Sequence, residues 1–198
     1  MANEFRFEDH PDTTKFKKVE HEAISALAAE HGLEFSTDYL TFLKAHNGVN
    51  FDGLSTAAPL APGIETFDEI WYLFGVDTGF EYNDLRVYFG IDGFWTNPLL
   101  RAFAYPVGEG PGGDPIVQIF KGSAKGKIYF VDHEVLPFDG ELEDAGIDLE
   151  NPDEVLAFMV DVQGCFNEVA KSFSDLVNKL VVYDEDGRTQ IGIRRPLA

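Results

Sequence analysis

Apolar residues recur at helical spacing in two successive segments near the start of the chain. Between residues 15 and 30 they fall three or four positions apart, and His31-Gly32 supplies a typical C-terminal stop. A second helix follows directly, because Ser36 can cap it and Asp38 complements the dipole in its first turn. Asn47-Gly48 ends it, since these residue types best tolerate a left-handed backbone. The pattern therefore predicts two helices before any strand.

The middle of the chain is rich in aromatic and β-branched residues, which favour extended structure. Residues 116–120 and 128–131 flank a Gly-Ser-Ala-Lys-Gly turn and predict a hairpin. The other expected elements are strands at 69–76, 102–107 and 166–170 and helical turns at 82–89 and 97–102.

Ser172-Phe173-Ser174-Asp175 has capping-box spacing and predicts a last helix. Helices at both ends with strands between them indicate the α+β class: a central antiparallel sheet with N-terminal helices and a C-terminal helix packed on it. A chain of 198 residues without a linker-like stretch is expected to form a single domain over residues 1–198, with its core at about 15–180.

The charge balance narrows the classes of partner. Asp and Glu number 35 against 15 Lys and Arg, which gives a net charge of -20. Nucleic acids and anionic membranes are therefore disfavoured, whereas basic proteins are attracted. A lone Cys165 cannot form an intramolecular disulfide and fits a reducing compartment. The chain starts without a signal-peptide pattern and has no run of about 20 apolar residues, so a cytoplasmic location is expected.

Three stretches together resemble the SUKH (SMI/KNR-like) superfamily. The first is Phe35–Leu43 followed by Asn47-Gly48, the second is Gly112–Ile116 with Gly126–Glu134, and the third is Val169–Val177. Their order and spacing also match. The chain departs from the family in having Thr37 where a proline is common and in the long segment between residues 136 and 165.

The resemblance implies a non-catalytic, protein-binding domain that requires no cofactor. Bacterial members are largely immunity proteins, each of which neutralises a cognate toxin, often a nuclease or a deaminase. Fungal relatives regulate cell-wall synthesis and signalling through protein interactions. The family offers no catalytic residues to carry over to this sequence.

Acidic residues are concentrated in a stretch that could serve as the binding surface. Between residues 128 and 170 no Lys or Arg occurs, and another such stretch lies between residues 45 and 85. A basic nuclease surface would be complementary to such charge. The expected partner-binding residues are Asp132, Glu134, Asp139, Glu141, Glu143 and Asp144, with Trp95 as an exposed aromatic anchor. The other interpretation is that these acids only solvate loops.

Candidate catalytic and metal sites are few. Asp132-His133-Glu134 lies at a strand end, where neighbouring side chains would point to opposite faces and no other His or Cys completes a metal shell. Cys165 has the acidic neighbours Asp161 and Glu168, which predict a raised pKa and a structural thiol. The glycine-rich run at residues 108–114 lacks the Lys and Ser/Thr of a phosphate loop and is interpreted as a hairpin connection. A regulatory adaptor and a metal-dependent hydrolase remain the alternative functions.

Overall fold

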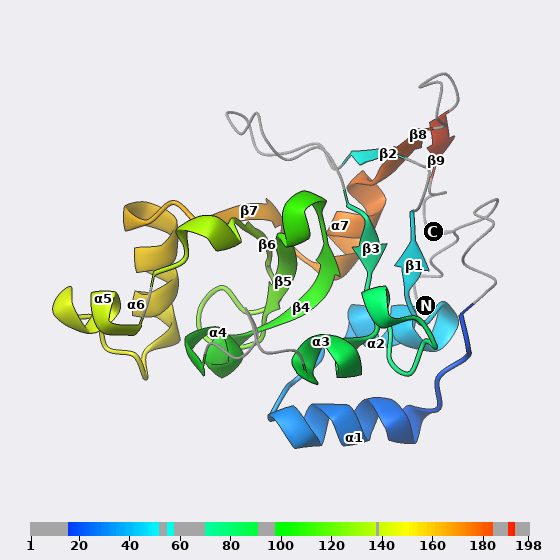
Figure 1. Ribbon diagram of the computed structural model, residues 1–198, viewed down its shortest axis with the longest axis horizontal. Helices are drawn as coiled ribbons and strands as arrows, with labels where there is room; N and C mark the ends of the chain where they lie inside the picture. Colours follow the sequence, from blue (N-terminus) through cyan, green and yellow to red (C-terminus); the bar gives the residue numbers. More distant parts are fainter. Residues whose placement is uncertain are drawn as a thin grey trace.

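A six-stranded antiparallel sheet forms the centre of the protein. The computed structural model describes residues 16–51, 55–57, 70–90, 98–137, 139–183 and 190–192. The strands of this sheet are β1 (Val49–Asn50), β3 (Tyr72–Leu73), β4 (Ala104–Glu109), β5 (Pro115–Ile119), β6 (Ile128–Val131) and β7 (Phe166–Ala170). Their order is β1-β3-β4-β5-β6-β7 (Figure 1), and each adjacent pair is antiparallel.

Helices precede, interrupt and follow this sheet. The α-helices are α1 (His21–His31), α2 (Thr37–Ala45), α3 (Leu85–Gly90), α4 (Pro98–Phe103), α5 (Asp139–Asp144), α6 (Pro152–Ala157) and α7 (Phe173–Lys179). Short 3-10 helices are η1 (Glu81–Asn83), η3 (Pro111–Gly113) and η4 (His133–Val135), and a π-helix, η5 (Phe158–Val162), continues α6. Strands β2 (Ser55–Ala57), β8 (Val181–Tyr183) and β9 (Gln190–Gly192) form a second antiparallel sheet. The predicted α+β class is confirmed.

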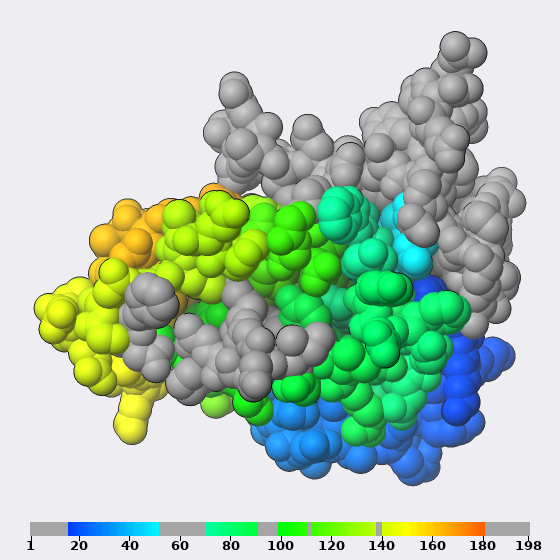
Figure 2. Space-filling model, in the orientation of Figure 1, coloured from blue at the N-terminus to red at the C-terminus, as the bar shows by residue number. Residues whose placement is uncertain are grey.

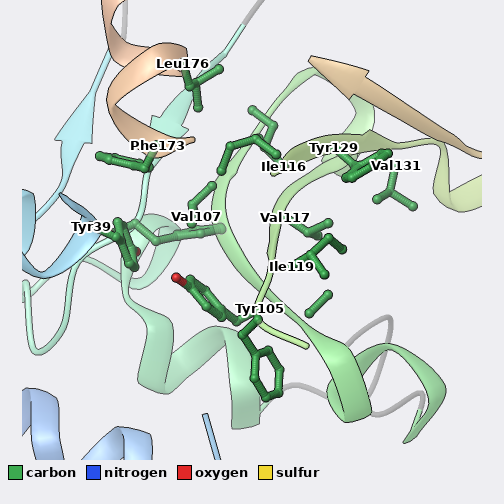
Figure 3. Packing of buried hydrophobic residues seen from close by; sticks show 14 of the residues in the cluster. Tyr39, Tyr105, Val107, Ile116, Val117, Ile119, Tyr129, Val131, Phe173 and Leu176 are labelled. Atoms are coloured by element: carbon green, nitrogen blue, oxygen red, sulfur yellow. The ribbon is translucent and has the colours of Figure 1, made fainter. Parts of the chain in front are cut away.

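Aromatic side chains pack α2 and α7 against one face of the main sheet (Figure 3). The Tyr39 ring of α2 lies 4.8 Å from that of Phe173 in α7 and 5.8 Å from that of Tyr105 in β4. All three side chains are buried, so each removes a large apolar area from water, worth about 25 cal/mol per Å². The two predicted terminal helices therefore meet on this face of the sheet.

The central strands are also buried on their second face. Phe166 of β7 has its ring 6.3 Å from that of Phe103 in α4 and 5.9 Å from that of Tyr129 in β6. Every residue of β5 and β6 is buried, which requires cover on both sides of the sheet. Helices α4 and α6, which contact one another, contribute to this second layer.

Several predicted boundaries shift, with identifiable causes. The first helix begins at His21, later than predicted: Glu20 before it is extended, and the Lys17 carbonyl accepts a hydrogen bond from Asn47 Nδ2 at 2.6 Å. The strand predicted at 69–76 contains only Tyr72–Leu73 among its described residues; Gly75 forms an isolated bridge with Asp84, and the chain bends directly after it. The hairpin turn between β5 and β6, the strand at 166–170 and the last helix are confirmed.

The segment between residues 136 and 165 was not predicted to be helical, yet it contains α5, α6 and η5. Asn151 caps α6 by accepting a hydrogen bond from Asp153 N at 3.2 Å, and Pro152 occupies the first turn. This cap-and-proline signal was readable in the sequence. No helix among the described residues is long and apolar enough to span a bilayer.

Candidate protein-interaction surface

The polar residues of the Phe35–Leu43 signature are used inside the fold. Ser36 Oγ accepts a hydrogen bond from Tyr39 N at 3.3 Å and lies 2.7 Å from Gln118 Oε1 of β5. Asp38 Oδ2 accepts a hydrogen bond from Ser174 N at 2.7 Å, which ties the start of α2 to the start of α7. These contacts join three elements that are distant in sequence. The signature therefore specifies architecture and leaves these side chains little capacity to bind a partner.

Asn47-Gly48 has a similar structural role. Asn47 is 1% exposed, and its Nδ2 donates to the carbonyls of Lys17 and Val76 while its Oδ1 accepts from Val76 N at 2.9 Å. The backbone approaches so closely here that a Cβ on Gly75 would lie 2.1 Å from Asn47 O. The amide thus fastens both the N-terminal segment and the chain after β3.

The predicted acidic surface lies at the end of the molecule where α5 and α6 extend from the main sheet (Figures 1 and 2). Glu141, Glu143 and Asp144 are exposed on α5, which is anchored by the fully buried Leu142. Neither Glu143 nor Asp144 has a side-chain partner among the described residues. The α5 surface, defined as Glu141, Glu143 and Asp144, is therefore exposed and acidic.

The other predicted partner-binding residues are placed less uniformly. Glu134 is exposed on η4, whereas Asp132 is half-buried and caps that turn by accepting a hydrogen bond from Glu134 N at 3.0 Å. The side chain of Asp139 and the whole of Trp95 lie outside the described residues.

Other acids of the 128–170 stretch are engaged within the chain. Asp153 Oδ1 accepts hydrogen bonds from the backbone and hydroxyl of Ser123 at 2.7 and 2.9 Å, which fastens α6 to the β5–β6 turn. Glu168 pairs with Lys127 across the sheet, with 2.7 Å between Oε2 and Nζ. Although the stretch itself contains no Lys or Arg, some of its carboxylates are therefore paired with residues from elsewhere in the chain.

In the described part of the second acidic stretch, Asp77 and Asp84 have partners within the chain, whereas Glu81 is exposed. Asp84 is buried and accepts hydrogen bonds from Thr78 N at 2.7 Å and Arg86 N at 3.0 Å. Asp77 pairs with the Arg86 guanidinium at 2.8 Å. No Lys or Arg lies within the stretch itself, as the sequence shows, but Asp77 and Asp84 find their partners just beyond it or in the backbone.

Cys165 is a buried structural thiol, as predicted. Its side chain is fully buried, with Sγ 3.5 Å from Met159 O and 3.7 Å from Met159 Sδ. Burial raises the pKa of the Cys165 thiol to about 11, and the charge of Asp132 adds to this effect. The predicted direction is confirmed, but the neighbours responsible are not the predicted Asp161 and Glu168.

Asp132-His133-Glu134 lies at the end of strand β6, as predicted, but its residues are not extended like those of a strand. The chain turns into η4, and His133 Nδ1 lies 2.6 Å from Asp114 Oδ1. Among the described residues no three His, Cys, Asp or Glu side chains gather as metal ligands. The glycine-rich run forms the connection between β4 and β5, closed by a hydrogen bond from Gly110 N to Asp114 O at 2.9 Å.

Exposed aromatic residues lie around β3 and η1, where the sequence analysis placed no partner-binding residue. Tyr82, Phe80 and Trp71 are 71, 44 and 40% exposed, and all belong to β3, η1 or the chain beside them. The Tyr82 ring stacks on that of Tyr72, with 6.4 Å between centroids. The sequence signal for the exposure of Phe80 and Tyr82 is their position in a loop between Gly79 and Asp84, because aromatic residues in loops are less often part of the core than those in strands.

Comparison with known families supports the predicted resemblance. The model of the SMI1/KNR4 family (SUKH-1) matches residues 18–179, which include all three stretches of the predicted resemblance and most of the chain. Neither the curated proteins nor the solved structures contain a match.

Proposed function

We propose that this chain, which belongs to the SMI1/KNR4 (SUKH-1) family, is an immunity protein that neutralises a basic toxin domain by binding it directly. Family membership fits either an immunity or a regulatory role, and both act through protein partners. The observation that carries the finer proposal is the α5 surface, whose Glu143 and Asp144 carboxylates have no partner among the described residues.

The proposed mechanism is occlusion and requires no chemistry on the toxin. A nuclease must present a positive surface to the phosphate backbone of its substrate. An acidic protein is steered toward that surface by long-range attraction, at rates that fall as salt rises. Once bound, it excludes the substrate by volume and by charge. A net charge of -20 strengthens the steering, and the α5 surface supplies the local complement.

The regulatory alternative uses the same kind of contact with a different partner. An adaptor would bind a basic cellular protein without abolishing any toxic activity. The two functions are therefore distinguished by what the partner does when free and when bound, and not by the affinity of the complex.

The test is affinity purification of the tagged full-length protein from its native cells at low and high salt, followed by mass spectrometry. We expect a stoichiometric basic polypeptide that high salt releases and whose nuclease or deaminase activity the pure protein inhibits. Charge reversal by Glu143→Lys and Asp144→Lys should weaken this complex about tenfold or more.

The matched control reverses two exposed acids on the opposite part of the chain, Glu20→Lys and Glu22→Lys at the start of α1. This pair changes the net charge equally, so it reports how much binding depends on overall charge alone. A captured partner without any activity to inhibit would replace immunity by the adaptor function. Equal weakening by both pairs would remove the α5 surface from the proposal.

A further inference from the structure

A second surface lies where β3, η1 and the end of β4 meet, away from α5 (Figure 1). Tyr72 of β3 pairs in register with Glu109 of β4, so the two side chains share a face of the sheet. Trp71 N donates to Glu109 O at 2.8 Å and fixes this register. The Tyr82 ring lies nearly parallel to that of Tyr72, at an interplanar angle of 16°. A pair of stacked rings therefore stands beside a carboxylate.

Glu109 carries a desolvation cost that no Lys or Arg among the described residues offsets by an ion pair. Its side chain is half-buried, and burial raises its pKa to about 7. His133 lowers that pKa and Asp114 raises it, so both lie close enough to act on the carboxylate. Among the described residues, no Lys or Arg forms an ion pair with Glu109. A cation from outside would restore the charged form of this group.

The loop that presents Tyr82 is held in place by its own polar contacts. Asp84 accepts a hydrogen bond from Thr78 N, and Gly75 N donates to Asn83 O at 2.9 Å. Thr78 Oγ1 also lies 3.0 Å from Phe80 O. These hydrogen bonds hold the loop in one conformation, so less conformational entropy is lost when a partner binds. Tyr82 nevertheless remains 71% exposed.

We propose that Tyr72, Tyr82 and Glu109 form the binding site for an arginine side chain that a basic protein partner presents. A planar guanidinium stacks on tyrosine rings and at the same time donates to a carboxylate, which a compact ammonium does less well. Asp114 adds negative charge, while Phe80 and Trp71 widen the apolar rim. That the partner is a basic protein rests on the proposed function. The preference for arginine follows from the rings and the carboxylate of the site itself.

This site would give the complex an orientation. The α5 surface is purely acidic and exposed, which suits steering more than geometric selection. The tyrosine–glutamate site combines rings with one desolvated carboxylate, which is the composition typical of binding hot spots. A partner that engages both would be fixed in rotation as well as position.

The experiment is a titration of the ¹⁵N-labelled full-length protein with N-acetyl-arginine amide at pH 8, followed by NMR. N-acetyl-citrulline amide, which has the same shape without the charge, is the matched ligand. We expect saturable shifts centred on Tyr72, Tyr82 and Glu109 with the arginine compound only. Tyr82→Ala and Glu109→Gln should each weaken binding about fivefold or more, and Glu81→Gln, which neutralises an exposed acid of the same loop, less than about twofold.

The pH dependence of the affinity for the arginine compound gives a second readout, which would not change if Glu109 had only a structural role. Lowering the pH from 8 to 6 protonates Glu109, so affinity should fall in the wild type and change less in Glu109→Gln. The groups that act on Glu109 are Asp114 and His133, and protonation of His133 would oppose cation binding in both proteins.

Equal shifts with citrulline, or arginine shifts centred on α5, would overturn the site. Its failure is distinct from that of the proposed function. If arginine binds here while no basic partner is captured from cells, the arginine site is supported and the immunity function is rejected. If a toxin is captured but Tyr82→Ala and Glu109→Gln bind it and the arginine compound as the wild type does, only this site is lost.

Discussion

The Phe35–Gly48 signature and the α5 surface both carry polar side chains but use them in opposite ways. In the first, Ser36, Asp38 and Asn47 are satisfied by groups from distant elements. In the second, Glu143 and Asp144 are exposed and have no partner among the described residues. Polar side chains with internal partners contribute to stability, whereas those without partners are available for binding. The comparison predicts that substitutions in the two regions have separable effects.

The largest effect is expected in the aromatic core beneath the signature. Phe173 is fully buried, with its ring 4.8 Å from Tyr39 and 5.0 Å from Phe42. Phe173→Ala should lower the free energy of unfolding by about 3–5 kcal/mol, because it leaves a cavity. Val162→Ala, at a position 67% exposed, is the control and should change it by less than about 0.5 kcal/mol. Urea denaturation measures both, and similar losses would contradict the assigned packing.

A smaller loss is expected when the Asn47 amide is removed. Asn47→Gly keeps a residue that tolerates the local φ of 54° but leaves Val76 N without its acceptor. We expect a loss of about 1–3 kcal/mol in the free energy of unfolding and faster amide exchange at Val76. Asn178→Ala, at an exposed position in α7, should leave exchange at Val76 unchanged. Unaltered exchange in Asn47→Gly would show that the amide does not hold this segment.

The pH dependence of stability should reveal a third polar contact, at the end of α1. Arg101 Nη2 lies 3.0 Å from His31 Nδ1, and because arginine only donates, this imidazole nitrogen must be unprotonated. Burial lowers the pKa of His31, while Glu30 raises it and Arg101 and Arg86 lower it further. Because the folded-state pKa is depressed, this stability is present above the unfolded value and is lost as pH falls below about 6.5.

The measurement is urea denaturation of wild type and His31→Gln between pH 5 and 8. The variant should lose part of the decline in stability below about pH 6.5. His21→Gln, which replaces an exposed histidine at the start of the same helix, should keep the wild-type decline. Identical pH profiles for wild type and His31→Gln would refute the neutral-histidine contact.

The smallest effect on stability is expected at the α5 surface itself. Glu143→Lys with Asp144→Lys should change the free energy of unfolding by less than about 0.5 kcal/mol, or raise it slightly, because cations favour a helix C-terminus. Thermal and urea denaturation check this, alongside the binding measurement. A large destabilisation would mean that these carboxylates have structural partners, and the contrast between the two regions would disappear.

Much of the fold is predictable because its signals are local. Ser36 and Ser172 are recognisable as helix caps from their positions, and both accept the expected backbone hydrogen bonds. The turn before β6 and the strand at Phe166–Ala170 follow equally from short-range composition. The signature from Phe35 to Gly48 indicates the family for the same reason, since its residues are close together in the chain.

The sequence by itself determined the class, the family and the charge of this protein, since caps, turns and acidic runs depend on residues a few positions apart. Only the tertiary structure decided which acids are free. Asp153 accepts a hydrogen bond from Ser123 and Glu168 forms an ion pair with Lys127, whereas the Glu143 carboxylate has no partner among the described residues. The tertiary structure also stacked Tyr82 on Tyr72, which is in register with Glu109, because pairing between strands sets neighbours that no local pattern specifies.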